Sequence, residues 1–448
     1  MNILKKITRG NDRSVAVKKN IIGSLIIKGF SIAISLLVVP ITLGYVNAEM
    51  YGVWLTLSSI MMWIYFFDVG FTLGLRNKLT EALATKNYDY GKRLVSTTYI
   101  MMICIFVPLC IIFELLLPYL QISSLLNVNS SYESQLQNTM KLLILFCCFQ
   151  MIVNVISSVI AAFQKVALSS LFSVIGQAIS LVIIYLLTVF YKRSNLESLA
   201  FAISLPPILV TFIASIYLFK FKIKKVSPSL RYFDKKLVKN LFSLGVKFFI
   251  IQLQVIILYQ CTNILISNLS GPEQVTEYNL AYKYLSVIMM IFSLIVSPLW
   301  PAFTDAYTKK DFIWMRGIYG KMIKIFILLA LVLIIMTAIS QFAFYLWIGD
   351  KAHVSWNMTI IVAMYILLQT WNTLQIQMIN GIGTIKLQSY VTLIGLFCHI
   401  PLSLILGKYI GASGVIYSMI IINSIYCLFF TKQINLILNR KAFGIWIQ

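Results

Sequence analysis

Long runs of apolar residues, separated by short polar connections, fill most of this chain. Each run is at least as long as the ~20 residues that an α-helix needs to cross the ~30 Å hydrocarbon core of a bilayer. The pattern therefore predicts an all-α polytopic membrane protein. Twelve membrane-spanning helices are predicted, at residues 20–46, 51–70, 94–120, 140–163, 167–191, 196–219, 241–269, 278–303, 318–347, 356–381, 385–409 and 412–438.

One polar segment divides the twelve predicted helices into two sets of six. Residues 220–239 read KFKIKKVSPSLRYFDKKLVK, a basic stretch that contains Pro228. We therefore expect an amino-terminal six-helix bundle at residues 1–219, a basic cytoplasmic linker at 220–239 and a carboxy-terminal six-helix bundle at 240–448.

The two halves share local sequence features. Lys19-Asn20 opens the first predicted helix and Lys239-Asn240 opens the seventh. Thr80-Glu81-Ala82 ends the region of the second helix, and Thr304-Asp305-Ala306 ends that of the eighth. Six helices per half give both halves the same orientation, as in transporters that bind substrate between parallel repeats and work by alternating access. The features predict two pseudo-symmetric bundles; a duplicated bundle with a purely structural role is the alternative.

Positive charge is concentrated in alternate connections. The formal net charge is +23, and the chain has 37 Lys and Arg residues. With the amino terminus placed in the cytoplasm, 29 of them lie on the inner side, six on the outer side and two within helices. This bias follows the positive-inside rule, so both termini are expected in the cytoplasm. It favours contact with anionic phospholipids and argues against nucleic acid as a partner.

Three lysines are candidates for substrate binding, because ionisable side chains within a membrane usually face protein or water. Lys28 and Lys247 lie at similar depth in the first and seventh helices, and as point charges they suit a phosphate or diphosphate in a cavity open to the cytoplasm. The alternative is that both snorkel to the inner headgroups. Lys283, near the outer end of the eighth helix, either receives an anionic group or anchors the interface beside Tyr282 and Tyr284.

Three acidic residues are candidates for gating or ion coupling. Asp68, near the inner end of the second helix, is either a gate or a helix-end acid. Glu114, in the third helix, is a candidate proton or sodium site. Asp305 lies four residues before Lys309, so a local ion pair is its simplest explanation.

The tenth predicted helix is rich in amides. Gln369, Asn372 and Asn380 share a helical face, with Trp371 beside it. Amide donors and acceptors combined with a flat aromatic ring suit a sugar. The alternative is hydrogen bonding between helices, which is common in membrane bundles. His399, in the eleventh helix, is expected to be a packed, hydrogen-bonded residue rather than a proton relay.

Motifs for enzymatic chemistry are missing from the sequence. It contains no GxxxxGK[ST] phosphate loop, no DxD pair, no HExxH and no CxxC. Each of these motifs places a metal, a phosphate or a redox pair by its spacing. No catalytic residue, metal site or cofactor is therefore predicted, and the short outer loops also argue against a glycan polymerase or ligase.

Three short motifs carry a resemblance to a known family. They are Tyr51-Gly52-Val53-Trp54 opening the second predicted helix, Phe67-Asp68-Val69-Gly70 closing it, and Pro298-Leu299-Trp300-Pro301-Ala302-Phe303 closing the eighth. With six-plus-six helices, the chain resembles bacterial oligosaccharide flippases of the O-antigen type, in the multidrug/oligosaccharidyl-lipid/polysaccharide exporter superfamily. The resemblance implies a V-shaped pair of six-helix bundles around a central cavity.

The resemblance also implies a substrate and a location. The substrate is an oligosaccharide on undecaprenyl diphosphate, such as an O-antigen or capsule repeat unit, which moves from the inner to the outer leaflet of the bacterial cytoplasmic membrane. Lys28 and Lys247 are the positions that fit the cationic cavity residues of the family. Other glycan-assembly membrane proteins are further expected partners.

Three other functions stay open at the level of sequence. A cation-coupled exporter of small organic compounds would have the same fold with a carboxylate-lined cavity. A membrane glycan polymerase or ligase would lengthen or transfer glycan instead of changing its leaflet. A scaffold for a glycan-assembly complex would transport nothing.

Overall fold

The computed structural model describes residues 12–64, 68, 71–163, 165–190, 195–238, 261–296 and 299–447. In these ranges the regular structure is helical, and no strand occurs. The α-helices are α2 (Asp12–Tyr45), α3 (Ala48–Met62), α4 (Phe71–Ala84), α5 (Tyr88–Leu116), α6 (Ile122–Leu126), α7 (Glu133–Val153), α8 (Val155–Ala162), α9 (Val166–Phe190), α10 (Leu196–Tyr217), α12 (Pro272–Val296), α13 (Leu299–Thr308), α14 (Phe312–Ala338), α15 (Ser340–Ile348), α16 (Trp356–Ile382), α17 (Lys386–Ile410) and α18 (Ala412–Leu438).

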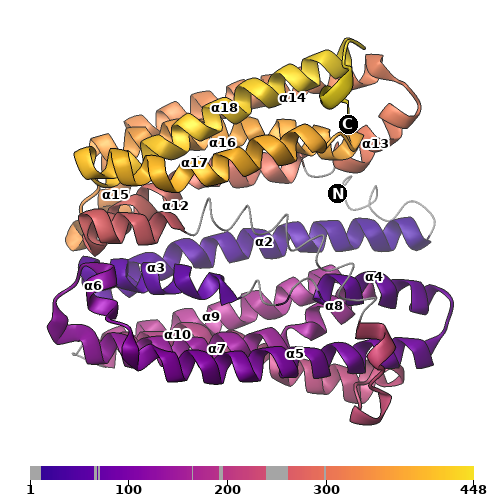
Figure 1. Ribbon diagram of the computed structural model, residues 1–448, viewed down its shortest axis with the longest axis horizontal. Coiled ribbons are helices and arrows are strands. Elements are labelled where there is room, and N and C mark those ends of the chain that lie inside the picture. The colour runs from indigo at the N-terminus through magenta and orange to yellow at the C-terminus, as the bar shows by residue number, and fades with distance from the viewer. Residues whose placement is uncertain are drawn as a thin grey trace, which may run out of the picture. The chain divides into compact units, whose positions relative to one another are not determined.

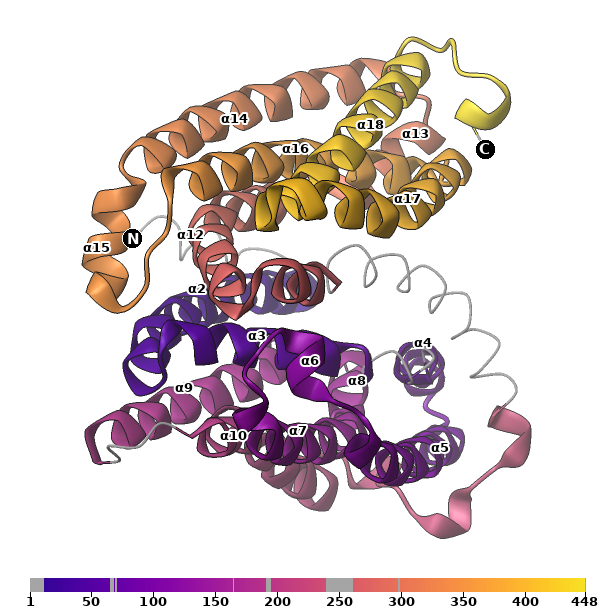
Figure 2. The same ribbon diagram turned by 60° about the vertical axis from the view of Figure 1, so that its left-hand side comes forward.

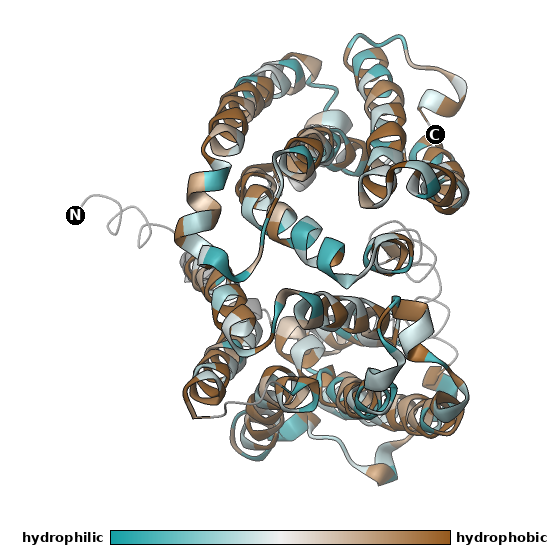
Figure 3. Cartoon of the chain, turned by 90° about the vertical axis from the view of Figure 1, so that its left-hand side faces the viewer, coloured by the Kyte–Doolittle hydropathy of each residue, from teal (hydrophilic) through white to brown (hydrophobic). Residues whose placement is uncertain are grey.

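Ten helical segments in the described part of the chain are long and apolar enough to cross a membrane. Hydrophobic residues cover most of each long helix, and hydrophilic residues gather at helix ends and in the connections (Figure 3). The prediction of an all-α polytopic membrane protein is therefore confirmed. The count of twelve stays a prediction, because α3 has only 15 residues where helix 51–70 is predicted, and helix 241–269 lies mainly outside the described residues.

The chain divides into two compact units. Unit 1 comprises Met1–Asn47 and Leu57–Leu253, and unit 2 comprises Ala48–Thr56 and Gln254–Gln448. In unit 1, α9 packs against α2 and α10, while α7 packs against α5 and α10. In unit 2, α16 and α17 both pack against α18, and α12 packs against α16 (Figures 1 and 2).

Two helices predicted as continuous are interrupted in the described part of the chain. The predicted helix 140–163 is divided at Asn154 into α7 and α8, and the predicted helix 318–347 is divided at Ile339 into α14 and α15. At the first break, the Ser157 hydroxyl donates to Asn154 Oδ1 at 2.7 Å. Short polar side chains compete with the backbone for hydrogen bonds in this way, and a hydropathy pattern alone does not detect the effect.

The basic segment after α10 is folded onto α5 rather than free. The backbone amides of Ser229 and Asp234 each donate at 3.0 Å to hydroxyls of α5, those of Ser96 and Thr97 respectively. The Lys92 ammonium also lies 4.1 Å from the centre of the Tyr232 ring, a cation–π contact. Residues 220–238 thus form part of unit 1 and lie along one helix of it.

One helix–turn–helix geometry occurs in both units. Between α4 and α5, the amide of Asn87 donates to Ala82 O at 2.8 Å; between α13 and α14, the amide of Asp311 donates to Ala306 O at 2.9 Å. Asn87 then accepts from the amide of Tyr90 at 3.1 Å as the N-cap of α5, and Asp311 caps α14 in the same way. The geometry repeats the correspondence seen in the sequence around Thr80 and Thr304.

Candidate functional site

Lys28 lies on the exposed side of α2 in unit 1. The helix packs on α9, and the Ser31 hydroxyl, one turn after Lys28, donates to Gln177 Oε1 at 3.1 Å. Lys28 is exposed, and it forms no ion pair with any residue that the structure describes. Lys247 lies outside the described residues. The predicted pairing of the two lysines therefore stays a prediction.

Lys283 lies in the middle of α12, a helix of unit 2 long and apolar enough to cross a membrane. The prediction that it lies near the outer end of its helix was wrong, because α12 begins at Pro272, six residues before the predicted start. Its side chain is half-buried, and its ammonium makes no ion pair or side-chain hydrogen bond within the described ranges. A cation held at such a depth without a counter-charge is costly and is a functional candidate by default. Lys283 is therefore the predicted substrate-binding residue whose surroundings best suit an anionic ligand.

Aromatic packing fixes α12 on both sides of Lys283. The Tyr282 ring lies 5.8 Å from that of Tyr278 and 6.3 Å from that of Tyr365 on α16. The Tyr284 hydroxyl donates to the carbonyl of Met336 on α14 at 3.2 Å. These contacts hold the helix against two neighbours, so the position of the lysine backbone is set by a rigid part of unit 2.

A polar stripe on α12 continues from Lys283 in both directions. Asn279, four residues earlier, donates to Asn263 Oδ1 at 2.8 Å, and Ser286 lies three residues later. Residues at such spacings share one face of a helix. We call Asn279, Lys283 and Ser286 the α12 polar stripe. Sequence reasoning missed Asn279, although its spacing from Lys283 is visible in the sequence.

The α16 amides are in different surroundings. Asn372 is 1% exposed, and its Nδ2 donates to Asn423 Oδ1 on α18 at 3.1 Å. Gln369 and Asn380 are half-buried, and the Trp371 indole donates to the Thr431 hydroxyl at 2.8 Å. Asn372 thus joins two helices in this structure, whereas Gln369 and Asn380 keep part of their surface accessible.

His399 belongs to a buried polar cluster between α17 and α18. The ring is fully buried, and its Nδ1 lies 3.0 Å from the Ser418 hydroxyl and 3.3 Å from the Ser403 hydroxyl. Nδ1 is therefore hydrogen-bonded inside an apolar bundle, whereas the buried Nε2 has no hydrogen-bond partner among the residues that the structure describes. This arrangement is the packed, hydrogen-bonded one expected from an isolated histidine.

The three acidic candidates belong to different elements of the chain. Asp68 accepts hydrogen bonds from the amide and the hydroxyl of Thr72, and so caps the amino end of α4. Glu114 is half-buried on α5 and is attracted electrostatically by Lys141 of α7. The side chain of Asp305, on α13, lies outside the described residues. No group of three or more metal-binding side chains occurs in the part of the chain that the structure describes.

A helix also occurs where the sequence predicts a connection. Residues Phe71–Ala84 form α4, and its buried residues Leu75, Leu79 and Ala82 recur at spacings of four and three. That periodicity is typical of an amphipathic helix and is present in the sequence. The predicted helices 51–70 and 94–120 leave residues 71–93 as a connection, and that expectation was wrong, because the charged residues on the exposed face of α4 lower its hydropathy.

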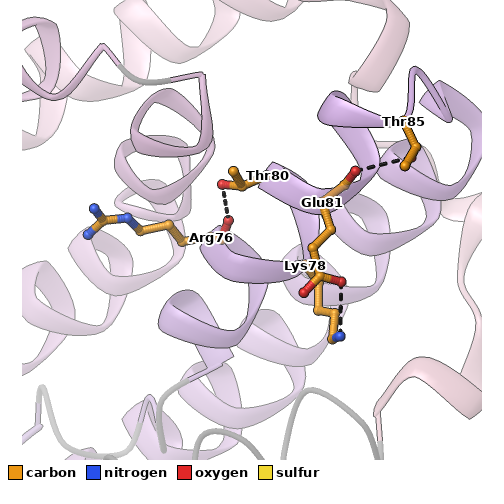
Figure 4. Close-up of polar contacts among 5 residues, drawn as sticks. All are labelled: Arg76, Lys78, Thr80, Glu81 and Thr85. Carbon is orange, nitrogen blue, oxygen red and sulfur yellow. Dashed lines mark hydrogen bonds and ion pairs between the residues drawn. The ribbon is translucent and has the colours of Figure 1, made fainter. Parts of the chain in front are cut away.

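Two basic residues of α4 differ in their contacts (Figure 4). The Lys78 ammonium lies 3.0 Å from Glu81 Oε2, in an exposed ion pair. The backbone carbonyl of Arg76 accepts a hydrogen bond from the Thr80 hydroxyl at 2.7 Å. The Arg76 guanidinium points away from Lys78 and Glu81. Arg76 is therefore an exposed helical cation without an ion-pair partner among the described residues, a candidate that sequence reasoning treated as part of a loop.

Comparisons with known proteins agree on family and fold. Residues 17–307 match the family described as polysaccharide biosynthesis protein, and residues 248–405 match the family described as MatE. A Yersinia pseudotuberculosis protein named for O-antigen export is 23% identical over 289 residues. That match covers 63% of this chain and 64% of the relative, so the chain spans less than two thirds of the relative's length.

Solved structures of multidrug transporters share the fold. A multidrug resistance MATE family transporter of the MOP superfamily in an inward-facing conformation has a TM-score of 0.76 and 15% identity, and the match covers 94% of this chain and all of that one. The outward-facing conformation of such a transporter has a TM-score of 0.62 and 16% identity, covering 98% and 99%. The predicted resemblance to polysaccharide export proteins is confirmed at the level of the family, and the solved structures confirm the fold. The chain belongs to the polysaccharide biosynthesis protein family.

Proposed function

We propose that this protein is a flippase for an oligosaccharide carried on undecaprenyl diphosphate. It moves the glycan from the inner to the outer leaflet of the bacterial cytoplasmic membrane by alternating access. Family membership and the relative named for O-antigen export support the choice of a glycan substrate. The single observation that carries the proposal is the ammonium of Lys283, which lies within a helix long enough to cross a membrane and has no ion-pair partner among the described residues.

The charge of Lys283 suits the diphosphate of such a substrate. A diphosphate is anionic throughout its passage, so a protein that moves it must offer cations where water is scarce. Asn279 lies on the same face of α12, and because its Nδ2 donates to Asn263 Oδ1, its own Oδ1 is the group assigned to accept from a hydroxyl of the first sugar. The α12 polar stripe therefore combines one cation with uncharged hydrogen-bonding groups.

Three further cations are assigned to entry of the diphosphate. Lys28 and Lys247 are assigned this role from their matched depth in the sequence, and Arg76 from its exposed, unpaired guanidinium on α4. All three are assigned to the step before the substrate meets Lys283, in the middle of α12. The polyprenyl chain stays in the surrounding lipid.

The glycan itself is assigned to amides of α16. Gln369 and Asn380 are half-buried and can offer donors and acceptors without leaving their helix. Asn372 contacts the glycan only if its hydrogen bond to Asn423 opens first, since the side chain is 1% exposed. Asp68, Glu114 and Asp305 are assigned to gating or ion coupling.

The proposal is tested in a bacterial strain that lacks its own oligosaccharide flippase and makes the matching glycan. The wild-type protein should restore surface glycan, and Lys283→Arg should retain more of it than Lys283→Gln, because the arginine keeps the charge. Protein in the membrane fraction is quantified in parallel. If Lys283→Gln restored as much surface glycan as the wild-type protein at an equal protein level, the proposed role of Lys283 would be contradicted.

A cation-coupled exporter of small organic compounds is the second candidate, and the MatE match over residues 248–405 favours it. Such an exporter needs acids that bind its cation or drug. In the described part of unit 2, Glu277 is buried, but its Oε1 accepts from the amide of Ser355 at 2.9 Å at the start of α16. Resistance to organic cations, measured with and without the protein, distinguishes the two functions.

A further inference from the structure

An apolar hollow with two lysines at one end lies on unit 1, between the α8–α9 hairpin and α10. Its volume is about 900 Å³, and its apolar lining includes Phe172, Ile175 and Ile213. Lys165 and Lys222 line it as well. The hollow is open to the surroundings along exposed residues such as Ile213, which is 64% exposed, and Ile175, which is 40% exposed.

The surroundings of this hollow are lipid. The segments Ala167–Phe190 and Leu196–Lys222, which form its walls, are both long and apolar enough to cross a membrane. In a bilayer the hollow therefore meets acyl chains along its apolar length. A surface groove of this kind is filled by hydrocarbon rather than left empty.

The charged end of the hollow adds a preference for one headgroup. Lys165 and Lys222 are exposed, and neither forms an ion pair with any residue that the structure describes. Tyr217, five residues before Lys222, also lines the hollow and is 51% exposed, as interfacial tyrosines commonly are. Both lysines lie on the side that the positive-inside rule assigns to the cytoplasm, where anionic lipids are attracted to basic residues.

We infer that this hollow binds one anionic phospholipid. Its acyl chains lie along Phe172, Ile175 and Ile213, and its phosphate lies between the ammonium groups of Lys165 and Lys222. The inference does not depend on the proposed flippase activity, because it concerns a bilayer lipid and a surface within unit 1 alone.

The test is native mass spectrometry of the purified full-length protein with added phosphatidylglycerol or phosphatidylethanolamine. The wild-type protein should retain phosphatidylglycerol more strongly than phosphatidylethanolamine. The double variant Lys165→Gln, Lys222→Gln should bind phosphatidylglycerol about 30-fold more weakly at low salt. The factor is the expected contribution of two lysines beside an anionic headgroup. Lys220→Gln with Lys224→Gln removes the same charge from exposed residues that do not line the hollow, and should leave binding unchanged.

A second variant tests the hollow independently of its charge. Ala214 is half-buried and lines the hollow, so Ala214→Trp should fill it and reduce phosphatidylglycerol binding. Ile216 is exposed on the same helix and does not line the hollow, so Ile216→Trp should leave phosphatidylglycerol binding unchanged. Unchanged phosphatidylglycerol binding in the double lysine variant, or equal retention of the two phospholipids by the wild-type protein, would each overturn the inference.

Discussion

Lys86 in unit 1 and Lys310 in unit 2 occupy the same position of the same turn. Each follows a helix, has a positive φ of 57° or 58°, and is followed by the residue that caps the next helix. Each amide also donates to the carbonyl three residues earlier, at 3.2 Å in unit 1 and 3.0 Å in unit 2. Glycine is the usual residue at this position, because a side chain at positive φ is strained.

Replacing Lys310 by glycine should therefore stabilise the protein. Lys310→Gly relieves the strain of a left-handed side chain and should raise the free energy of unfolding by about 1 kcal/mol. The measurement is thermal unfolding of the purified protein in detergent. The control is Lys309→Gly, in the same turn without a positive φ, which should lower stability by about 0.5–1 kcal/mol. A loss of stability in Lys310→Gly would contradict the argument.

Close packing of α9 on α10 depends on Gly176. A Cβ atom at this position would lie 2.4 Å from Pro207 Cα, a contact with backbone that a side-chain rotation cannot relieve. Gly176→Ala should destabilise unit 1 by about 1–3 kcal/mol, as overpacking does. Gly317→Ala is the matched control, since nothing lies within 4 Å of a Cβ there and the change should be neutral or stabilising. Similar unfolding temperatures for the two variants would show that the helices separate easily at Gly176.

The role of Asn372 in helix packing can be separated from a role in glycan contact. The Asn372–Asn423 hydrogen bond predicts that Asn372→Leu and Asn423→Leu destabilise the protein non-additively, with a coupling of about 0.6–1.7 kcal/mol in a double-mutant cycle. Surface glycan should then fall in proportion to folded protein. An Asn372→Leu protein of wild-type stability that fails to display glycan would instead assign Asn372 to the substrate.

The lysines predicted to receive the diphosphate are tested together. Lys28→Ala with Lys247→Ala should reduce surface glycan to less than about a tenth of wild type, because two cations that face the same anion are lost. The corresponding double arginine variant should keep most of the activity. Protein level in the membrane fraction is the control for insertion. Unchanged glycan display would place both lysines at the inner headgroups.

The fold is largely predictable from hydropathy, because each long apolar run must satisfy its backbone within one helix. The positions at which helices begin and break are less predictable from hydropathy. Asp68 caps α4 and Asn154 divides α7 from α8 through local hydrogen bonds, which a window of averaged hydropathy does not register. Arg76 was consequently treated as part of a connection although it lies on a helix.

The hydrogen-bond partners of polar side chains inside the bundles are also hard to predict from the sequence. Asn372 and Asn423 are 51 residues apart, and His399 and Ser418 are 19 apart. The sequence shows that these side chains must be satisfied, but which helix supplies the partner depends on how α16, α17 and α18 pack. The unpaired state of Lys283 likewise becomes evident only when the side chains around α12 are in place.

Transfer of glycan between leaflets is the most direct test of the account. Purified protein is placed in liposomes whose lipid-linked oligosaccharide starts in one leaflet, and the glycan that reaches a glycosidase on the other side is followed with time. The account predicts that the wild-type protein exposes the glycan unchanged in length, that Lys283→Gln slows exposure about tenfold, and that Lys283→Arg slows it less. Glycan that stays in its leaflet, or that is lengthened or transferred to another acceptor, would contradict it.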